Sequence, residues 1–130
     1  MLSKPQGPPP RDPRHELGLA GEAAAQGFLR SRGWTIEAHR FRFGRHDLDI
    51  VARRGDVVAF VEVKCRSTGS FGPPAEAVTW RKRQILATGA RWWQSRFGRA
   101  ADRYRFDVIA VYEGGGPPRI EHLEDAWRPG

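Results

Sequence analysis

The chain has 130 residues, 39% of them hydrophobic, which is enough for one domain with a core of its own. Lys and Arg number 22 against 15 Asp and Glu, so the formal net charge at pH 7 is +7. A balance this basic favours a polyanionic partner, although merely soluble proteins also carry it and it does not separate DNA from RNA. The longest apolar runs are too short to cross a bilayer, so no membrane-spanning segment is expected.

The single cysteine, Cys65, excludes an intrachain disulfide and makes a reducing cytoplasm the simplest compartment. The N-terminus lacks the apolar core of a secretory signal. A high proline content fixes φ and removes amide donors there, so residues 1–13 are predicted to be a disordered, polyproline-like tail. A single domain is expected over 14–124, followed by a short tail over 125–130.

The first half of the domain is predicted to contain one helix and three strands. The helix is expected over His15–Arg32, because small and apolar side chains recur there three and four residues apart. Residues 34–38 are predicted to form a first strand. Two further strands are expected over 47–53 and 57–64, joined by a hairpin turn at 53–56.

A glycine-rich loop over 67–74 is followed by three predicted elements: a helix from Ala75 or Thr79 to Phe97, a strand over Tyr104–Tyr112 and an edge strand over Arg119–Leu123. The strand over 104–112 is a nearly continuous apolar run, which is typical of a strand covered on both faces. The order of helices and strands predicts an α/β protein with a mixed central sheet.

Charged side chains interrupt the apolar strands of the predicted hairpin. Because side chains alternate between the faces of a strand, the polar ones share a face within each strand: Asp47 with Asp49, and Glu62 with Lys64. The opposite faces carry Leu48 and Ile50 on the first strand, and Val61, Val63 and Cys65 on the second.

The register of the hairpin decides whether these pairs meet. If Ala52 pairs with Val57, Asp47 lies across from Glu62 and Asp49 is the diagonal neighbour of Glu62, within reach of it. A slip by one residue would place the two polar pairs on opposite faces.

Clustered carboxylates repel one another, and burying them is costly without a partner. A divalent cation removes that cost, and Mg²⁺ needs only one or two carboxylates because it keeps several waters. A lysine beside the ion could orient a water or stabilise phosphate charge. The chemistry indicated is metal-assisted hydrolysis of a phosphodiester. The alternative is a solvated hairpin face, whose acids pair with Lys64 and nearby arginines.

The spacing of Asp49 and Glu62-Val63-Lys64 resembles the catalytic signature of the restriction-endonuclease-like nuclease superfamily. Together with three further segments, it resembles the YraN-like family, which is related to archaeal Holliday-junction resolvases. The segments are GLAGEAAA (18–25), FVEVKCR (60–66), FGPPAEAV (71–78) and RFDVIAV (105–111). The resemblance implies a restriction-endonuclease-like mixed sheet flanked by helices.

The resemblance also implies roles for individual residues. Asp49 and Glu62 would bind Mg²⁺ or Mn²⁺ together with the Val63 carbonyl, Lys64 would act on the water or the transition state, and Glu22 would be a helical acid facing the metal. Two positions depart from the family pattern. His46 and Asp47 stand where the family has Gly-Glu, and Cys65 stands where threonine is common.

Other residues have a functional and a structural interpretation. The start of the second helix could contact DNA phosphates or be a solvated basic turn: Arg81, Lys82, Arg83 and Gln84. Glu22 could equally be an exposed helical acid, whereas Asp107 beside Arg105 is interpreted as a structural salt bridge. Cys65 is expected to be a buried small side chain, and the four histidines are interpreted as surface residues.

These observations predict a cytoplasmic, metal-dependent DNA endonuclease for branched or unusual DNA, acting without a nucleotide cofactor. Because a four-way junction needs two symmetric cuts, a homodimer is expected at least on DNA. The alternatives are a nucleic-acid-binding module that keeps the fold without catalysis, and a basic RNA- or ribosome-associated protein.

Overall fold

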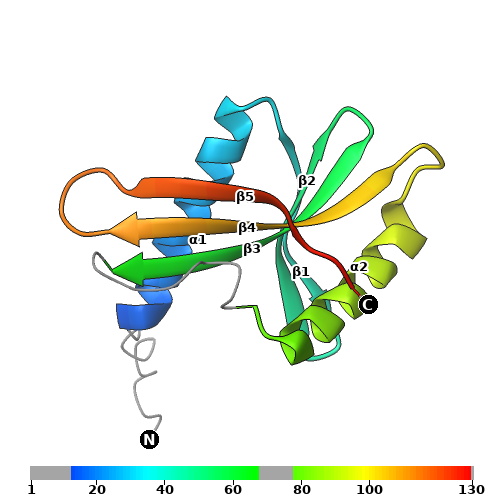
Figure 1. Cartoon of the computed structure of the whole chain (residues 1–130), viewed down its shortest axis with the longest axis horizontal. Coiled ribbons are helices and arrows are strands. Elements are labelled where there is room, and N and C mark those ends of the chain that lie inside the picture. The colour runs from blue at the N-terminus through cyan, green and yellow to red at the C-terminus, as the bar shows by residue number, and fades with distance from the viewer. Residues whose placement is uncertain (1–12, 68–77, 130) are drawn as a thin grey trace, which may run out of the picture.

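The computed structural model describes residues 13–129 except 68–77, and its elements follow the predicted order (Figure 1). They are α1 Pro13–Ser31, β1 Thr35–Phe43, β2 His46–Arg54, β3 Val57–Ser67, α2 Trp80–Phe97, β4 Arg103–Glu113 and β5 Arg119–Trp127. Apart from Pro13, the tail predicted over 1–13 lies outside the described residues, as does most of the glycine-rich loop. No helix in the described ranges is long and apolar enough to cross a membrane.

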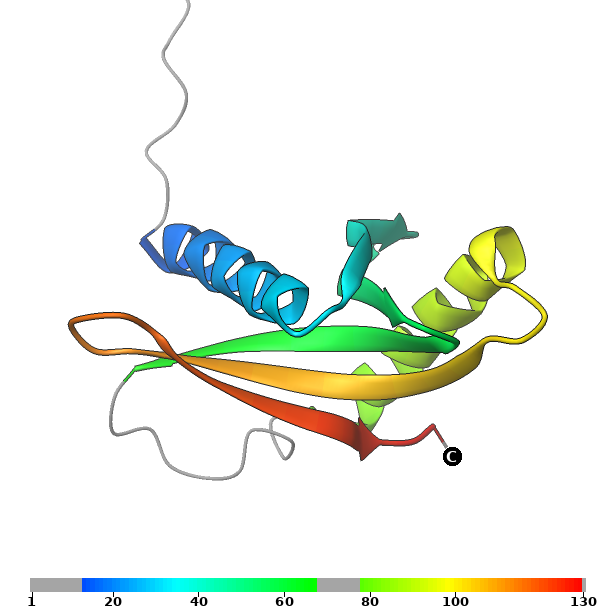
Figure 2. The ribbon, with the colours of Figure 1, turned by 90° about the horizontal axis from the view of Figure 1, so that it is seen from above.

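The five strands form one mixed sheet in the order β1-β2-β3-β4-β5, which confirms the predicted α/β class. Strands β3 and β4 are parallel, and the other neighbours are antiparallel. The parallel pair needs a crossover connection, and α2 lies within it. Helix α1 lies behind β3–β5 in Figure 1, and Figure 2 shows it from above.

Two apolar cores lie on opposite faces of the sheet. Val58 and Phe60 of β3 pack toward α2, together with Trp93. The alternate residues Ala59 and Val61 pack toward α1, in a cluster that includes its Ala25 and Leu29. This is the alternation expected for a strand covered on both faces. Packing on both faces of β3 therefore fixes the direction in which the site residues of this strand point.

Strand β2 breaks the predicted alternation. Leu48 belongs to the core on the α2 side, whereas Ile50 belongs to the core on the α1 side, so they do not share a face as predicted. The pairing of β2 with β3 begins only at Ile50, opposite Val61. In Figure 1 the first half of β2 comes from below while the second half of β3 runs left. Asp49 therefore lies where the two strands part, a place we call the fork.

Every strand is longer than predicted, and β1 and β5 exceed their predicted lengths the most. β1 reaches Phe43 instead of residue 38, with a register irregularity between Ile36 and Ala38. β5 continues to Trp127, which is buried and stacks on Phe106 with ring centroids 4.0 Å apart. Residues 125–127 therefore belong to the sheet and not to the tail predicted over 125–130, because an aromatic contact with the core holds them there.

Candidate metal and nucleic-acid site

The hairpin register differs from the prediction by two residues. Ala52 pairs with Ala59, not Val57, because the turn is only Gly55-Asp56, with Gly55 at a φ of 63°. A two-residue shift keeps the residues of the paired ladder on their predicted faces. It moves the position opposite Glu62 from Asp47 to Asp49, although the paired ladder itself stops one residue earlier.

The Asp49 carboxylate takes the place of a strand partner at the fork. Its Oδ2 accepts the backbone N–H of Val63 at 2.9 Å. Burial and the neighbouring Glu62 raise the pKa of Asp49 from 3.8 to about 7, and Glu22 adds to the rise. The Val63 hydrogen bond and the Lys82 cation oppose it. Loss of solvation, reinforced by the neighbouring acids, thus makes the ionised form of Asp49 unfavourable at the fork.

Glu62 is the most buried acid of this group, with a side chain only 7% exposed. Its Oε1 lies 3.4 Å from Lys64 Nζ and 4.0 Å from Lys82 Nζ. Its Oε2 is buried and has no hydrogen-bond partner among the described residues. A buried carboxylate oxygen without a partner is unfavourable, which marks a position that a cation or water would stabilise.

Glu22 of α1 approaches the fork from the other side of the sheet. Its Oε2 accepts hydrogen bonds from His39 Nε2 and Arg40 Nε, both at 2.9 Å. Arg40 has a φ of 56°, a left-handed conformation that costs energy for a residue with a side chain. The sequence gives no signal for these two partners, because a single strained residue inside a strand leaves no trace in the periodicity.

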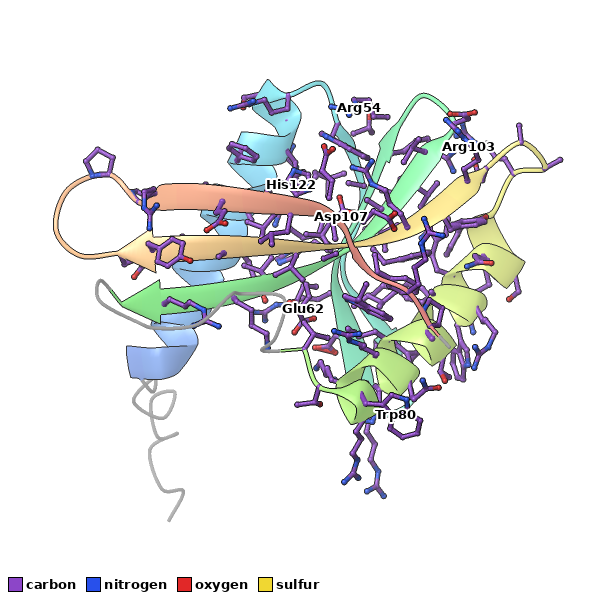
Figure 3. The ribbon with its side chains drawn as sticks, in the orientation of Figure 1. Arg54, Glu62, Trp80, Arg103, Asp107 and His122 are labelled. Atoms are coloured by element: carbon purple, nitrogen blue, oxygen red, sulfur yellow. The ribbon has the colours of Figure 1, made fainter. Side chains whose placement is uncertain are left out.

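The residues of the predicted basic group at the start of α2 have different surroundings in the structure. Thr79 caps the helix and accepts the Lys82 backbone N–H at 3.2 Å, and the Lys82 side chain reaches Glu62. Arg83 donates instead to the Val78 carbonyl at 3.1 Å and lies over the Trp127 ring. Arg81 is exposed and Gln84 half-buried. Figure 3 shows Trp80, which is 70% exposed, at the start of this helix below Glu62.

Two further positions considered in the sequence are exposed. Asp47 is exposed and pairs in register with Arg42 of β1. Cys65 was expected to be buried but is exposed, since β3 extends there beyond the main core. Its Sγ still lies against α1, where a Cβ on Gly21 would come within 2.1 Å of it.

Asp107 has the structural role that was predicted for it. It is fully buried, and both carboxylate oxygens accept 3.0 Å hydrogen bonds from Arg105. Its oxygens also accept the Asp125 N–H at 2.9 Å and contact His122 Nε2 at 2.7 Å. His122 is only 10% exposed, so the prediction that it is a surface residue is wrong. Four polar contacts from three residues of β4 and β5 satisfy this carboxylate and tie the two strands together.

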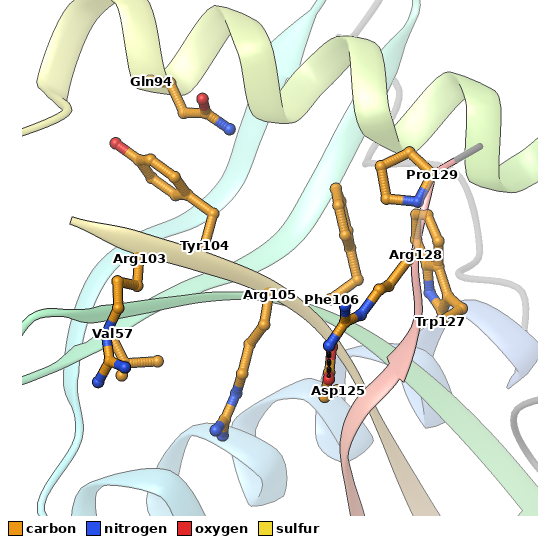
Figure 4. A pocket seen from close by; sticks show the side chains of 10 residues that line it. All are labelled: Val57, Gln94, Arg103, Tyr104, Arg105, Phe106, Asp125, Trp127, Arg128 and Pro129. Atoms are coloured by element: carbon orange, nitrogen blue, oxygen red, sulfur yellow. Dashed lines mark hydrogen bonds and ion pairs between the residues drawn. The ribbon is translucent and has the colours of Figure 1, made fainter.

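A pocket of about 640 Å³ lies away from the fork between the ends of β4, β5 and α2 (Figure 4). Its arginines already have acidic partners: Arg128 bonds Asp125 at 2.9 Å, and Arg103 bonds Asp56 at 3.2 Å. None of the acids at the fork lines this pocket. Its size therefore does not make it the better candidate for phosphodiester chemistry.

The donors at the fork fit a hard divalent cation in kind, because they are carboxylate oxygens and include the unpartnered Glu62 Oε2. Within the described ranges, no three His, Cys, Asp or Glu side chains are close enough to hold an ion by themselves. An ion there would depend on Asp49, Glu62, a main-chain oxygen and water. Mg²⁺ and Mn²⁺ accept such a donor set.

The fold and the fork define a mixed α/β protein, with a five-stranded sheet between two helices and a carboxylate–lysine cluster where two strands part. The sheet and its flanking helices are consistent with a restriction-endonuclease-like fold. The chain belongs to the Uncharacterised protein family UPF0102, whose model matches residues 21–111.

Relatives match almost the whole chain. A UPF0102 protein of Desulforapulum autotrophicum is 41% identical over 88% of this chain and 95% of its own. One from Anaeromyxobacter dehalogenans is 40% identical over 92% of both chains, and one from Rhodococcus jostii is 41% identical over 85% and 95%. The resemblance inferred from the sequence motifs is therefore confirmed at the level of this family.

Proposed function

We propose that the protein is a Mg²⁺- or Mn²⁺-dependent DNA endonuclease that acts on branched or otherwise unusual DNA. The observation that carries the proposal is the fork, where Asp49 and Glu62 come together on parting strands and Glu62 keeps a buried oxygen without a partner. The preference for branched DNA rests on the resemblance of the motifs to resolvases. A net charge of +7 supports a polyanionic substrate.

Each residue of the fork has a distinct role in this proposal. Asp49 and Glu62 bind the ion, which when bound supplies Lewis-acid polarisation and an activated water. The backbone N–H and C=O of one strand residue point toward the same neighbouring strand. Because the Val63 N–H donates to Asp49, the Val63 carbonyl also points toward the Asp49 side of β3. Lys64 holds the water or stabilises phosphate charge, and Glu22 adds negative charge from α1.

The second candidate is a nucleic-acid-binding module without catalysis. It is favoured by the two lysines that contact Glu62, since Lys64 and Lys82 already compensate part of its charge without a metal. In that case the fork is a structural ion-pair cluster. The two candidates differ in what a divalent cation does to the protein.

The test is a cleavage panel of duplex, single-stranded, flap and four-way-junction DNA with Mg²⁺ or Mn²⁺, for wild type, Asp49→Asn and Asp47→Asn. Asp49→Asn should lower cleavage at least about a hundredfold, because an ion ligand is lost. Asp47→Asn should cut at close to the wild-type rate, because Asp47 is exposed and apart from the fork. Equal cleavage by wild type and Asp49→Asn would contradict the proposed site.

Metal binding gives a readout that does not depend on cleavage. Because the pKa of Asp49 is about 7, the ion must displace a proton below that pH. Mn²⁺ affinity measured by calorimetry should therefore rise as the pH increases from 6 to 8, with proton release at the lower end. If no Mn²⁺ binds and no substrate is cut, the binding module becomes the better description.

A further inference from the structure

A second pocket, of about 410 Å³, lies at the C-terminal end of α1, whose middle residue is Glu22. We call it the arginine pocket, and its lining residues are Phe28, Arg32, Trp34, Arg54, His122 and Glu124. Glu22 and Arg32 are ten residues apart, which is about 15 Å along a helix. Figure 3 shows Arg54 and His122 together, away from Glu62 and Trp80. No residue of the fork lines this pocket.

Two arginines of the pocket are held on aromatic faces. The Arg32 guanidinium lies 4.7 Å from the centroid of the Phe28 ring, and the Arg54 guanidinium lies 4.5 Å from that of Trp34. Arg54 also donates to the Arg32 carbonyl at 3.3 Å. Such contacts restrict both side chains, so less entropy is lost when they bind an anion.

The charges around the pocket leave one arginine without an acidic partner. Glu124 lies 3.3 Å from Arg105 and 4.0 Å from Arg54, so one carboxylate serves two guanidinium groups. Asp107, beneath His122, is bound by Arg105. Among the described residues, Arg32 makes no ion pair within 4.0 Å. The pocket therefore has an excess of positive charge.

His122 adds a polar wall with a fixed orientation. Asp107 accepts the Nε2–H, because an ionised carboxylate has no proton to donate, and this holds the ring in place. The rings of Phe28 and Trp34 contact the imidazole edge-on, at 6.1 and 6.4 Å between centroids. The two planar guanidinium groups are the donors suited to the oxygens of a phosphate, and the fixed imidazole bounds the pocket beside them.

We propose that the arginine pocket binds a phosphate group through Arg32 and Arg54. Its volume exceeds that of a bare phosphate, which suits one carried by a nucleotide or by a nucleic-acid strand. The site is separate from the fork and needs no metal, so phosphate binding can be tested independently of the proposed nuclease activity.

The test is a titration of metal-free protein in EDTA with inorganic phosphate, followed by two-dimensional NMR of the backbone, indole and arginine N–H groups. We expect saturable shifts at Trp34, Arg54 and His122. Arg32→Gln and Arg54→Gln should each weaken phosphate binding by about tenfold, the effect of losing one charge-assisted hydrogen bond. Glu124→Gln should strengthen it, because the acid of the pocket is removed.

Arg30→Gln is the matched control, because Arg30 is exposed on the same helix end and bonds Gln26 instead of lining the pocket. It should bind phosphate like wild type. Equal weakening by Arg30→Gln and Arg32→Gln would mean diffuse attraction and would overturn the site, as would shifts confined to other regions. If Arg54→Gln does not fold, the substitutions of the exposed residues Arg32 and Glu124 decide. Arg32→Gln should weaken phosphate binding and Glu124→Gln should strengthen it.

Short single-stranded oligonucleotides with and without a 5′-phosphate identify the source of the group. Competition with inorganic phosphate by both would indicate an internal phosphodiester. Competition only by the phosphorylated strand would indicate a strand end. If inorganic phosphate binds but neither strand competes, the group is free phosphate or a mononucleotide. Absence of any phosphate-dependent shift at the pocket up to millimolar concentration overturns the proposal.

Discussion

At the residue scale, Asp49 combines a half-buried position with two acidic neighbours. Its pKa of about 7 lies above the ordinary value of 3.8, so the folded protein holds this proton more tightly than the unfolded chain does. The contribution of Asp49 to stability therefore becomes less favourable as the pH rises from about 4 to 7. Above pH 7 the full penalty is present.

Asp49→Asn should remove this penalty while keeping the size of the side chain. We expect the variant to be more stable than wild type at pH 8, by on the order of 1–3 kcal/mol after allowance for solvent screening. The difference should shrink toward pH 4, where Asp49 is protonated. Urea unfolding in EDTA across this range measures it, with the exposed Asp47→Asn as control. A variant less stable than wild type at pH 8 would indicate that Asp49 is held by a favourable ion pair.

Lys82 is the cation from α2 that reaches the fork. It lies 4.0 Å from Glu62 and lowers the pKa of Asp49. Lys82→Met should therefore raise the pKa of Asp49 further, which carboxyl NMR can follow, and should cost at most about 1 kcal/mol of stability. Arg81→Met removes an exposed neighbouring charge and should shift this pKa less. Equal shifts would assign the effect to general charge and not to the Lys82 contact.

At the element scale, close approach of the helices to the sheet sets the position of both sides of the fork. Gly89 of α2 lies against Phe43 at the end of β1, where an added Cβ would come within 2.4 Å of the ring. Gly21 of α1 lies against Cys65, whose Sγ an added Cβ would approach within 2.1 Å. Small residues at these contacts let α1 and α2 bring Glu22 and Lys82 near the same carboxylates.

Gly89→Ala should destabilise the protein by about 1–3 kcal/mol, because the buried Phe43 ring would have to move. The gain in helix propensity, about 1 kcal/mol, only partly offsets this. Gly27→Ala in α1 is the matched control, since a Cβ there meets nothing within 4 Å, and it should stabilise slightly. Thermal or urea unfolding compares the two. Stabilisation by both substitutions would show that α2 can shift away from β1 at little cost.

At the scale of the whole molecule, the excess of cations predicts salt-dependent binding to DNA. Each phosphate neutralised contributes about −0.9 to the slope of log affinity against log salt concentration. We expect a slope of about −3 or steeper. Arg81→Met should reduce its magnitude by about one, if this exposed residue contacts a phosphate. Fluorescence anisotropy with duplex and junction DNA in EDTA measures the slope. A flat salt dependence would exclude electrostatic attraction as the basis of binding.

The sequence by itself determined the element order, the mixed α/β class and the family. Local signals are sufficient for these: the apolar run of β4, the two hydrophobic strands around Gly55, and motifs that keep their spacing. It also identified Asp107 as a structural ion pair, because an acid within a buried strand needs a cationic neighbour and Arg105 is two residues away on the same face.

Only the tertiary structure decided how the acids meet. Alternation holds while a strand is paired on both sides, but β2 leaves β3 at Asp49, so Leu48 and Ile50 face different cores. The partners of Glu22 and Glu62 come from β1 and α2, many residues away in the chain. Sequence periodicity reports which face a residue takes within one element. It does not report where two strands separate. Nor does it report which side chains of other elements then meet between those strands.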